Sequence, residues 1–336
     1  MTGLGRYLAA LDDVATVAEQ PRLARLVQHL RRPLRVRVRG RTGAGCASVS
    51  RALRRRGTTV LAADDAVDVE VHVLAETLKP EDAAALRRGG RPRIAVLNKA
   101  DVCGFGEEGP LARTAERCRA LQGQCGVEVL PLAALLAAAD LDDDMIGALG
   151  VLADEPADLG STDRFTAGAH SLSPAVRERL LAELDLFGIA HAVLAVRRGA
   201  DRAAVNATLH RLSGVAAVLD AITAAGAPVR YRRILDAAPV LAELSAGPEG
   251  ARVADGLASD EVVIARMAAA VEVLTAAGMA AAGDDTRAAP HLGRAVRWQR
   301  YAGGPLSPVL RACAADVVRG SLRLWAQAGG VAETAP

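Results

Sequence analysis

The chain has 336 residues and a formal net charge of +2, so its length allows about two domains of roughly 150 residues, and its charge predicts no strongly charged partner. Aromatic residues make up only 2% of the chain, which argues against a surface that stacks nucleic-acid bases. The five cysteines have no CxxC spacing and the six histidines no HExxH spacing, which disfavours a disulfide framework and a metal centre.

The N-terminus lacks the charged and then apolar pattern of a signal peptide. The longest apolar stretches, 129–139 and 267–279, are too short or too interrupted to span a bilayer. A cytoplasmic location and no transmembrane segment are therefore expected, with peripheral membrane contact left open.

Residues 1–32 are expected to form one or two helices, because apolar residues recur at helical spacing and Pro21 can begin a second helix. These helices could join a bundle formed later in the chain. Residues 33–139 alternate strands with helices, which predicts an α/β domain with a parallel sheet flanked by helices. Strands are predicted over 34–38, 58–62, 68–74, 93–97 and 127–130, and helices over 47–56, 80–88 and 110–122.

The first strand alternates valine with Arg35, Arg37 and Arg39. A central parallel strand is usually apolar on both faces, so this pattern needs an explanation. Either the arginines are solvated or salt-bridged, or they face a partner surface.

A glycine loop follows that strand and leads into the next helix. Gly40, Gly43 and Gly45 fit the GxxxxG part of a phosphate-binding loop, where backbone N–H groups and a helix N-terminus bind an anion. Cys46 and Ala47 stand where the motif has Lys and Ser/Thr, so a phosphate-binding cation and a Mg²⁺ ligand are missing. The alternatives are a tight turn without a ligand and, for Cys46 at a helix N-terminus, a lowered pKa and a redox role.

Asn98, Lys99 and Asp101 form an NKxD sequence directly after the strand at 93–97. An aspartate at this point can accept hydrogen bonds from N1 and N2 of guanine, which adenine cannot offer. Asn98 would brace the base and its loop, and the stem of Lys99 would lie along the ring. Chance is a weak explanation because the chain has only two lysines; a polar loop after a buried strand is the alternative.

With both motifs, residues 34–138 resemble the translation-factor-related class of P-loop GTPases, and among them bacterial dynamin-like and Era-like members. The resemblance implies that Gly40, Gly43, Gly45, Cys46 and Ala47 surround the phosphates and that Asn98, Lys99 and Asp101 select guanine. It also places Ala133 at the backbone contact to guanine O6, and Asp64 at the magnesium-associated aspartate.

The family's switch elements are missing from this sequence. There is no DxxG between the two motifs, and the short stretch between Arg56 and the strand at 68–74 leaves no room for two mobile switch loops. GTP or GDP is therefore an expected ligand, Mg²⁺ is a doubtful one, and no catalytic residue is assigned.

Residues 140–172 are expected to be a linker and 173–330 an all-α helical bundle domain. Helical patterns cover 174–186, 201–212, 215–225, 231–244, 261–277, 292–301 and 308–327. Residues 181–199, and within them 184–189, are similar to the start of the stalk bundle in actinobacterial dynamin-like proteins. No lysine-rich and aromatic lipid-binding segment accompanies them, so membrane remodelling is not expected.

Three functions remain open. The preferred one is a guanine-nucleotide-binding pseudo-GTPase that serves as a regulatory or assembly partner of an active dynamin-like GTPase. The second is a slow GTP hydrolase with atypical catalytic residues, and the third is a protein-interaction scaffold that binds no nucleotide. A nucleic-acid partner is not expected.

Overall fold

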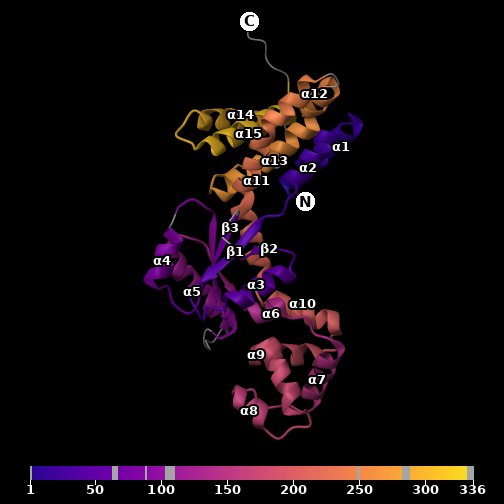
Figure 1. Ribbon diagram of the computed structural model, residues 1–336. Helices are drawn as coiled ribbons and strands as arrows, with labels where there is room; N and C mark the ends of the chain where they lie inside the picture. Colours follow the sequence, from indigo (N-terminus) through magenta and orange to yellow (C-terminus); the bar gives the residue numbers. More distant parts are fainter. Residues whose placement is uncertain are drawn as a thin grey trace. The chain divides into compact units, whose positions relative to one another are not determined.

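The computed structural model describes residues 2–62, 67–87, 89–102, 110–247, 250–281 and 288–330 (Figure 1). Contacts divide the chain into two compact units. The sheet unit is Leu34–Thr223, and the helical unit joins Met1–Pro33 to Ala224–Pro336. The N-terminal helices, which the sequence left free to join a bundle, thus group with the last third of the chain.

Five parallel strands form the sheet of the sheet unit. They are β1 (Arg35–Gly40), β2 (Thr59–Leu61), β3 (Val69–Leu74), β4 (Arg93–Asn98) and β5 (Val129–Leu132). Their order is β2-β1-β3-β4-β5. The predicted parallel sheet is confirmed, and β3 and β4 are almost entirely buried, as strands covered on both faces should be.

Helices cover both faces of this sheet. α3 (Cys46–Arg55) packs on β1, β2 and α6 (Ala134–Ala138), whereas α4 (Pro80–Arg87) packs on β3 and on α5 (Pro110–Cys125). Parallel crossovers are right-handed, and the chain reverses its direction across the sheet between β2 and β3. This reversal places α3 on the opposite face from α4 and α5 (Figure 1).

Ion pairs with Asp68, just before β3, and Glu70 in β3 engage two of the three arginines of β1, Arg35 and Arg39. The backbone N–H and Nε of Arg35 donate to Oδ2 of Asp68 at 2.9 and 3.2 Å. Nε of Arg39 lies 3.6 Å from Oε1 of Glu70, and Oε2 of Glu70 accepts from Nε of Arg93 at 3.1 Å. The salt-bridged explanation therefore holds for Arg35 and Arg39.

The chain after the sheet forms four further helices within the sheet unit. They are α7 (Asp143–Asp154), α8 (Thr162–Ala167), α9 (Pro174–Arg197) and α10 (Arg202–Leu212). Each begins with a side-chain cap, from Asp142, Ser161, Ser173 and Asp201 respectively. The expected linker at 140–172 is thus largely helical, and α9 and α10, expected in the bundle domain, group with the sheet.

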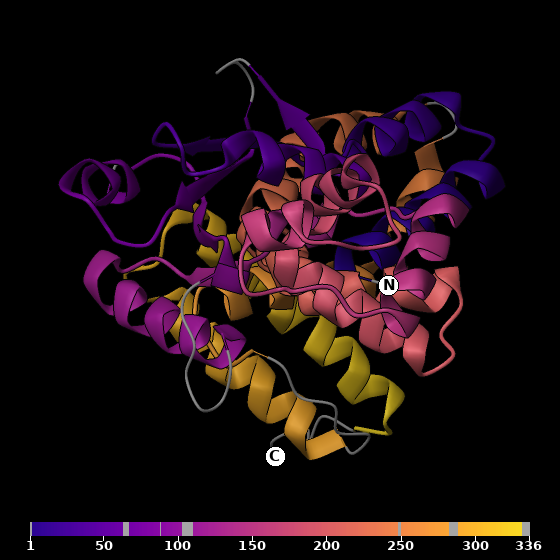
Figure 2. The same ribbon diagram turned by 90° about the horizontal axis from the view of Figure 1, so that it is seen from below.

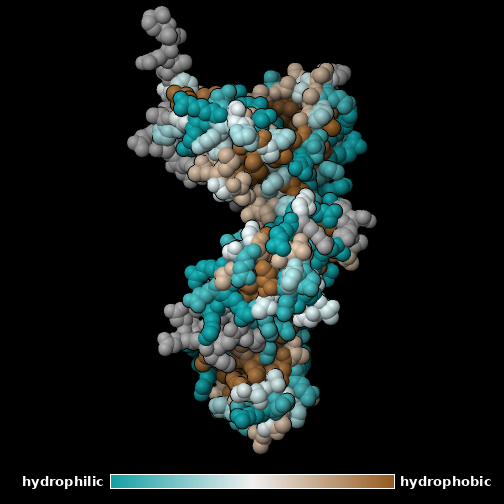
Figure 3. All heavy atoms as spheres, turned by 90° about the vertical axis from the view of Figure 1, so that its left-hand side faces the viewer, coloured by the Kyte–Doolittle hydropathy of each residue, from teal (hydrophilic) through white to brown (hydrophobic). Residues whose placement is uncertain are grey.

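These helices share a buried cluster with α6. Leu136, Phe165 and Leu184 are fully buried in it. Further hydrophobic side chains reach the surface at the lowest part of Figure 3, which belongs to α7–α9. Side-chain caps and an apolar cluster explain why this region forms helices that pack together with α6.

The helical unit consists of helices only among its described residues. They are α1 (Gly3–Val17), α2 (Pro21–Leu30), α11 (Val215–Ala246, from Ala224 onward), α12 (Gly250–Ala258), α13 (Asp260–Ala276), α14 (Ala288–Ala302) and α15 (Pro308–Gln327). Figures 1 and 2 both show α14 beside α15. α11 runs through Pro228 and Pro239 as one helix, although two segments were predicted there.

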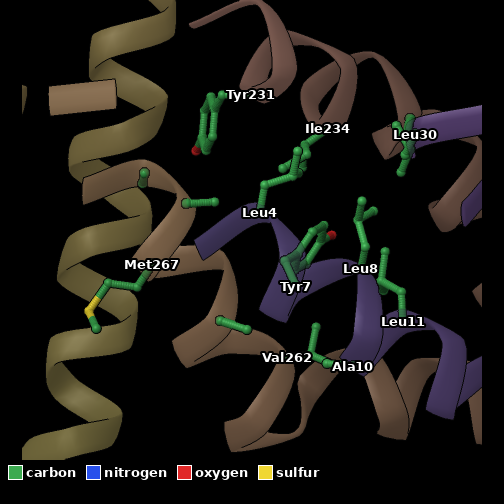
Figure 4. Packing of buried hydrophobic residues seen from close by; sticks show 14 of the residues in the cluster. Leu4, Tyr7, Leu8, Ala10, Leu11, Leu30, Tyr231, Ile234, Val262 and Met267 are labelled. Carbon is green, nitrogen blue, oxygen red and sulfur yellow. The ribbon is translucent and has the colours of Figure 1, made fainter. Parts of the chain in front are cut away.

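The core of this unit joins both ends of the chain. Figure 4 shows Tyr7, Leu8 and Leu11 of α1 near Ile234 of α11, whereas the side chain of Met267 of α13 points toward α15. The approach of α1 to α13 is close, since a Cβ on Gly3 would lie 2.4 Å from the carbonyl carbon of Ala268. The N-terminal helices are therefore part of the core of this unit.

Among the described helices, none taken singly is long and apolar enough to cross a membrane; α10 and α11, bent by 57° at their junction, pass that test of length and composition only as a pair.

Candidate functional site

The glycine loop lies at the point where the sheet reverses its winding. The chain passes from β1 to β2 on one side and then crosses to β3 on the other. In open α/β sheets, ligands bind at such a switch point, outside the carboxyl ends of the strands. The loop of residues 40–45 and the start of α3 occupy this position.

Glycine is required at several points of this loop. Gly43 and Gly45 have φ angles of +85° and +87°, in the region that glycine adopts without strain. A Cβ on Gly40 would lie 2.5 Å from the carbonyl oxygen of Val73 and 2.9 Å from Sγ of Cys46. The loop thus passes tightly over the end of β3 and turns into α3 with no side-chain cap and no acidic residue in the first turn, which leaves a helix N-terminus suited to an anion.

Cys46 and Ala47 bring no charge to that N-terminus. Cys46 is half-buried, and burial raises the pKa of its thiol. The lowered pKa considered for this cysteine from the sequence is therefore wrong, and with it the redox alternative loses its basis. These two positions therefore supply neither a cation nor a hydroxyl group to a phosphate.

Asn98 connects the two sequence motifs physically. Its side chain is buried; Nδ2 donates to the carbonyl oxygen of Ala44 at 3.0 Å, and Oδ1 accepts from the N–H of Ala134 at 3.3 Å. The end of β4 is thereby joined to the glycine loop and to the start of α6. A bracing role for Asn98 was expected; the partner at Ala134 could not be read from the sequence.

Lys99 follows Asn98, and Asp101 lies in the short 3-10 turn Ala100–Val102 that comes next. Lys99 has φ +59°, and Thr114 of α5 braces the turn by donating to the carbonyl oxygen of Ala100 at 2.9 Å. Burial raises the pKa of the partly buried Asp101 carboxyl, the negative charge of Asp185 raises it further, and Lys99 opposes both. The carboxyl group at the end of β4 is thus under the electrostatic influence of a second carboxylate, from α9.

Asp185 sits at a break in α9. Its φ and ψ are +57° and 174°, outside the helical region, and its own Oδ1 accepts from the N–H of Leu186 at 2.7 Å. Non-glycine residues rarely adopt such angles, and they cluster at functional sites. Sequence reasoning missed Asp185, although residues 184–189 had been singled out.

Ala133 caps the start of α6, directly before Ala134, whose N–H donates to Asn98. The N–H of Ala133 donates to the carbonyl oxygen of Ser213 at 2.9 Å. The backbone donor that the resemblance places here for guanine O6 is therefore already in use.

A polar network lies on the α4 side of the loop. Asp82, which is 1% exposed, accepts from Nε of Arg41 at 2.9 Å and from the N–H of Lys79 at 3.2 Å, and its Oδ1 is 2.9 Å from Nε2 of His72. Burial alone would raise the pKa of Asp82, but these hydrogen bonds hold it below its usual range. No sequence signal marked this network, because its members come from the loop, β3 and α4.

A polar cavity of about 340 Å³ borders this network. Its walls include Gly40, Arg41, His72 and Asp82 and also contain Arg39, Glu70, Glu81, Arg91 and Arg93. Both basic and acidic side chains line it. The glycine loop is therefore bordered by this charged cavity and by α3.

Asp64, the candidate for magnesium, lies outside the described residues. Among those that are described, no group of three or more His, Cys, Asp or Glu side chains is placed to hold a metal ion. The site as described consists of the glycine loop, the α3 N-terminus, Asn98 and Asp101.

No protein-family model, no curated protein and no solved structure matches this chain. The fold and the site define an α/β protein with a five-stranded parallel sheet whose switch point carries a glycine loop. The assignment to a particular class of nucleotide-binding protein stays a proposal.

Proposed function

We propose that this protein is a guanine-nucleotide-binding pseudo-GTPase that binds GDP or GTP at the carboxyl edge of its sheet and does not hydrolyse it. The observation that carries the proposal is Asn98, whose side chain ties the NKxD turn to the glycine loop. Two motifs that are distant in sequence are thereby one physical unit, as a single ligand in contact with both would need.

The chemistry at both ends of the proposed site, the glycine loop and Asp101, supports a guanine nucleotide as the ligand. The α3 N-terminus and the N–H groups of a glycine loop suit a phosphate. The Asp101 carboxylate accepts hydrogen bonds only, which suits the N1 and N2 donors of guanine. The neutral Cys46 and Ala47 take the positions of the lysine and hydroxyl that activate phosphoryl transfer, so binding without turnover is the consistent outcome.

We further propose that the bound state acts through a protein partner, an active dynamin-like GTPase. This part rests on the resemblance of residues 34–138 and on the presence of a separate helical unit in the chain. A slow GTP hydrolase and a scaffold without nucleotide are the alternatives; the occupied N–H of Ala133 favours the scaffold.

Asp101→Asn separates these alternatives. An asparagine offers one acceptor and one donor, so it mismatches guanine and matches xanthine, which carries a carbonyl oxygen in place of the N2 amine. Loss of hydrogen bonds to a charged group should weaken GDP binding at least about tenfold, while binding of xanthosine diphosphate should appear. Equilibrium titration of fluorescent GDP, competed with GDP, GTP, ATP and xanthosine diphosphate, measures both.

The exposed Asp143, at the start of α7 in the same unit, gives the matched control Asp143→Asn. The control should bind GDP as the unchanged protein does. Absence of GDP binding up to millimolar concentration would favour the scaffold, and Mg²⁺-dependent release of phosphate from GTP would favour the hydrolase.

Asn98→Ala is a poorer probe of the site. It would leave the carbonyl of Ala44 and the N–H of Ala134 without their buried partner. An effect of this change on GDP binding would therefore mix lost recognition with a distorted loop.

A further inference from the structure

The helical unit contains a cavity that the proposed nucleotide site does not use. It has a volume of about 300 Å³ and is lined by residues of α1, α11, α12, α13 and α15. Small-molecule sites typically start at this size. Most of its wall is aliphatic, with Leu241, Leu257, Val262 and Val263 among the lining residues.

One part of the wall is charged. Asp316, which is 2% exposed, accepts from the hydroxyl of Tyr231, from Nε of Arg266 at 2.7 Å and from Arg319. Arg266, Asp316 and Arg319 all line the cavity, and Tyr7 lies with them. Two guanidinium groups share one carboxylate, so this part of the wall has one positive charge in excess.

This excess charge persists at neutral pH. Burial alone would lower the pKa of Arg266, but the Asp316 carboxylate raises it above its usual value. Burial raises the pKa of Tyr7, so this phenol stays neutral and does not balance the charge.

Packing alone does not require these charges. Replacing a buried ion pair by apolar side chains of similar volume is often neutral or stabilising, and the surrounding bundle is built from Ala, Leu and Val. Each guanidinium carries five N–H donors, and a single donor of Arg319 is committed to Asp316 by hydrogen bonding. The Arg319 side chain, 60% exposed, thus retains donors for an anion.

We propose that this cavity of about 300 Å³ binds a short-chain or medium-chain aliphatic carboxylate, for which octanoate serves as the probe. The alkyl chain lies along Leu241, Leu257 and Val262, and the carboxylate binds Arg319 and Arg266. The aliphatic wall contacts the alkyl chain, and the two arginines bind the carboxylate head group.

Calorimetric titration of the full chain with octanoate tests this proposal, with hexanoate and octylamine as comparison ligands. Octanoate should bind, and octylamine, whose head group is a cation on an equally long chain, should bind at least tenfold more weakly. Each buried methylene strengthens binding about fourfold, so hexanoate should bind roughly fifteenfold more weakly than octanoate. Equal binding of octanoate and octylamine, or no binding of octanoate up to its solubility limit, would overturn the proposal.

Two variants place the ligand in this cavity. Arg319→Gln should weaken octanoate binding at least tenfold, because the head-group contact is lost. Arg323→Gln is the matched control, since Arg323 lies on the same helix, pairs with the exposed Asp260 at 3.3 Å and is not among the described residues lining the cavity. Ala242→Phe should fill the space and abolish binding.

Circular dichroism shows whether each variant keeps its helices. If Ala242→Phe unfolds, Arg319→Gln decides, because the Arg319 side chain is largely exposed. Unchanged octanoate affinity in a folded Arg319→Gln protein would refute the site. GDP binding should be the same in all three variants, so failure of this proposal is distinguishable from failure of the nucleotide proposal.

Discussion

In the proposed site, the charge of the Asp101 carboxyl group decides which base can bind. Burial, followed by the negative charge of Asp185, raises its pKa. Guanine needs the ionised form, because a protonated carboxyl offers a donor where guanine also has donors. Recognition should therefore weaken at a higher pH than the ordinary aspartate pKa of about 3.9 implies.

Asp185→Asn tests this coupling. Removing the charge lowers the pKa of Asp101, so the pH at which GDP binding falls to half should move to a lower value. Asparagine tolerates a positive φ and keeps the acceptor for the N–H of Leu186, so the break in α9 should survive. GDP affinity measured from pH 4.5 to 7.5 gives the two midpoints, and their difference cancels the titration of the nucleotide itself. Identical midpoints would show that Asp185 does not act on Asp101.

Gly45 has a second constraint beyond its backbone conformation. A Cβ there would lie 2.2 Å from Nδ2 of Asn98, whereas a Cβ on Gly43 would meet nothing within 4 Å. Both residues have positive φ, so Gly43→Ala should cost about 1 kcal/mol of unfolding free energy. Gly45→Ala should cost clearly more, roughly 2–3 kcal/mol, since the hydrogen bond from Asn98 to Ala44 is also disturbed.

Urea unfolding of the two variants measures this difference. Equal losses would mean that Asn98 moves aside at no cost and that the contact between the two motifs is loose. The comparison needs no ligand, so it examines the connection between the motifs independently of nucleotide binding.

Three elements are held together at Asp82: the glycine loop through Arg41, β3 through His72, and α4, on which Asp82 lies. Asp82→Ala should cost about 2–3 kcal/mol of unfolding free energy, because buried polar partners lose their acceptor. Glu81→Ala, at the exposed neighbouring position in the same helical turn, is the matched control and should cost little.

The pH dependence of this effect has a definite sign. The pKa of Asp82 is held below its usual value in the folded state, so its stabilisation is present above the unfolded pKa of about 3.9 and is lost as the pH falls through the folded pKa. The stability difference between the unchanged protein and Asp82→Ala should therefore shrink below about pH 4. A difference that stays constant to pH 3 would contradict the assignment.

Element by element, the sequence predicts the strands better than the helices that follow them. All five predicted strands overlap observed ones, and the predictions for β3 and β4 are the closest, since burial on both faces leaves an unambiguous apolar run. α6 and α8 are too short for a helical period to show, and α7 follows an acidic stretch that resembles a loop until Asp142 is recognised as its cap. α11 passes through two prolines because packing overrides a local helix-breaking preference.

The residues of the candidate site also differ in whether the sequence predicts them. The glycines, Asn98 and Asp101 are visible as local patterns, because chemistry at a strand end needs particular residues at fixed spacing. Asp185 and Ser213 are invisible, because each reaches the site from a helix far along the chain. Tertiary contacts of this kind leave no mark in a short sequence window.

At the scale of the whole molecule, the chain order differs from the spatial grouping. The helical unit takes its first two helices from residues before the sheet and the rest from residues after α10. Leu11, Leu23 and Val27 of these first helices are fully buried in its core. Boundaries read along the sequence cannot reveal such a discontinuous unit, because the helical pattern alone does not say which helices pack together.

Two units with separate cores should respond separately to ligands. GDP at a concentration 100 times its dissociation constant should stabilise the sheet unit by about 2.7 kcal/mol and leave the helical unit unchanged, because every proposed contact lies within Leu34–Thr223. Hydrogen exchange followed by mass spectrometry resolves the two. Slower exchange should be confined to peptides of β1, α3, β4 and their neighbours, and should vanish in Asp101→Asn. Equal protection of α1 and α13 would show that the two units unfold as one, and nucleotide binding would then be felt throughout the chain.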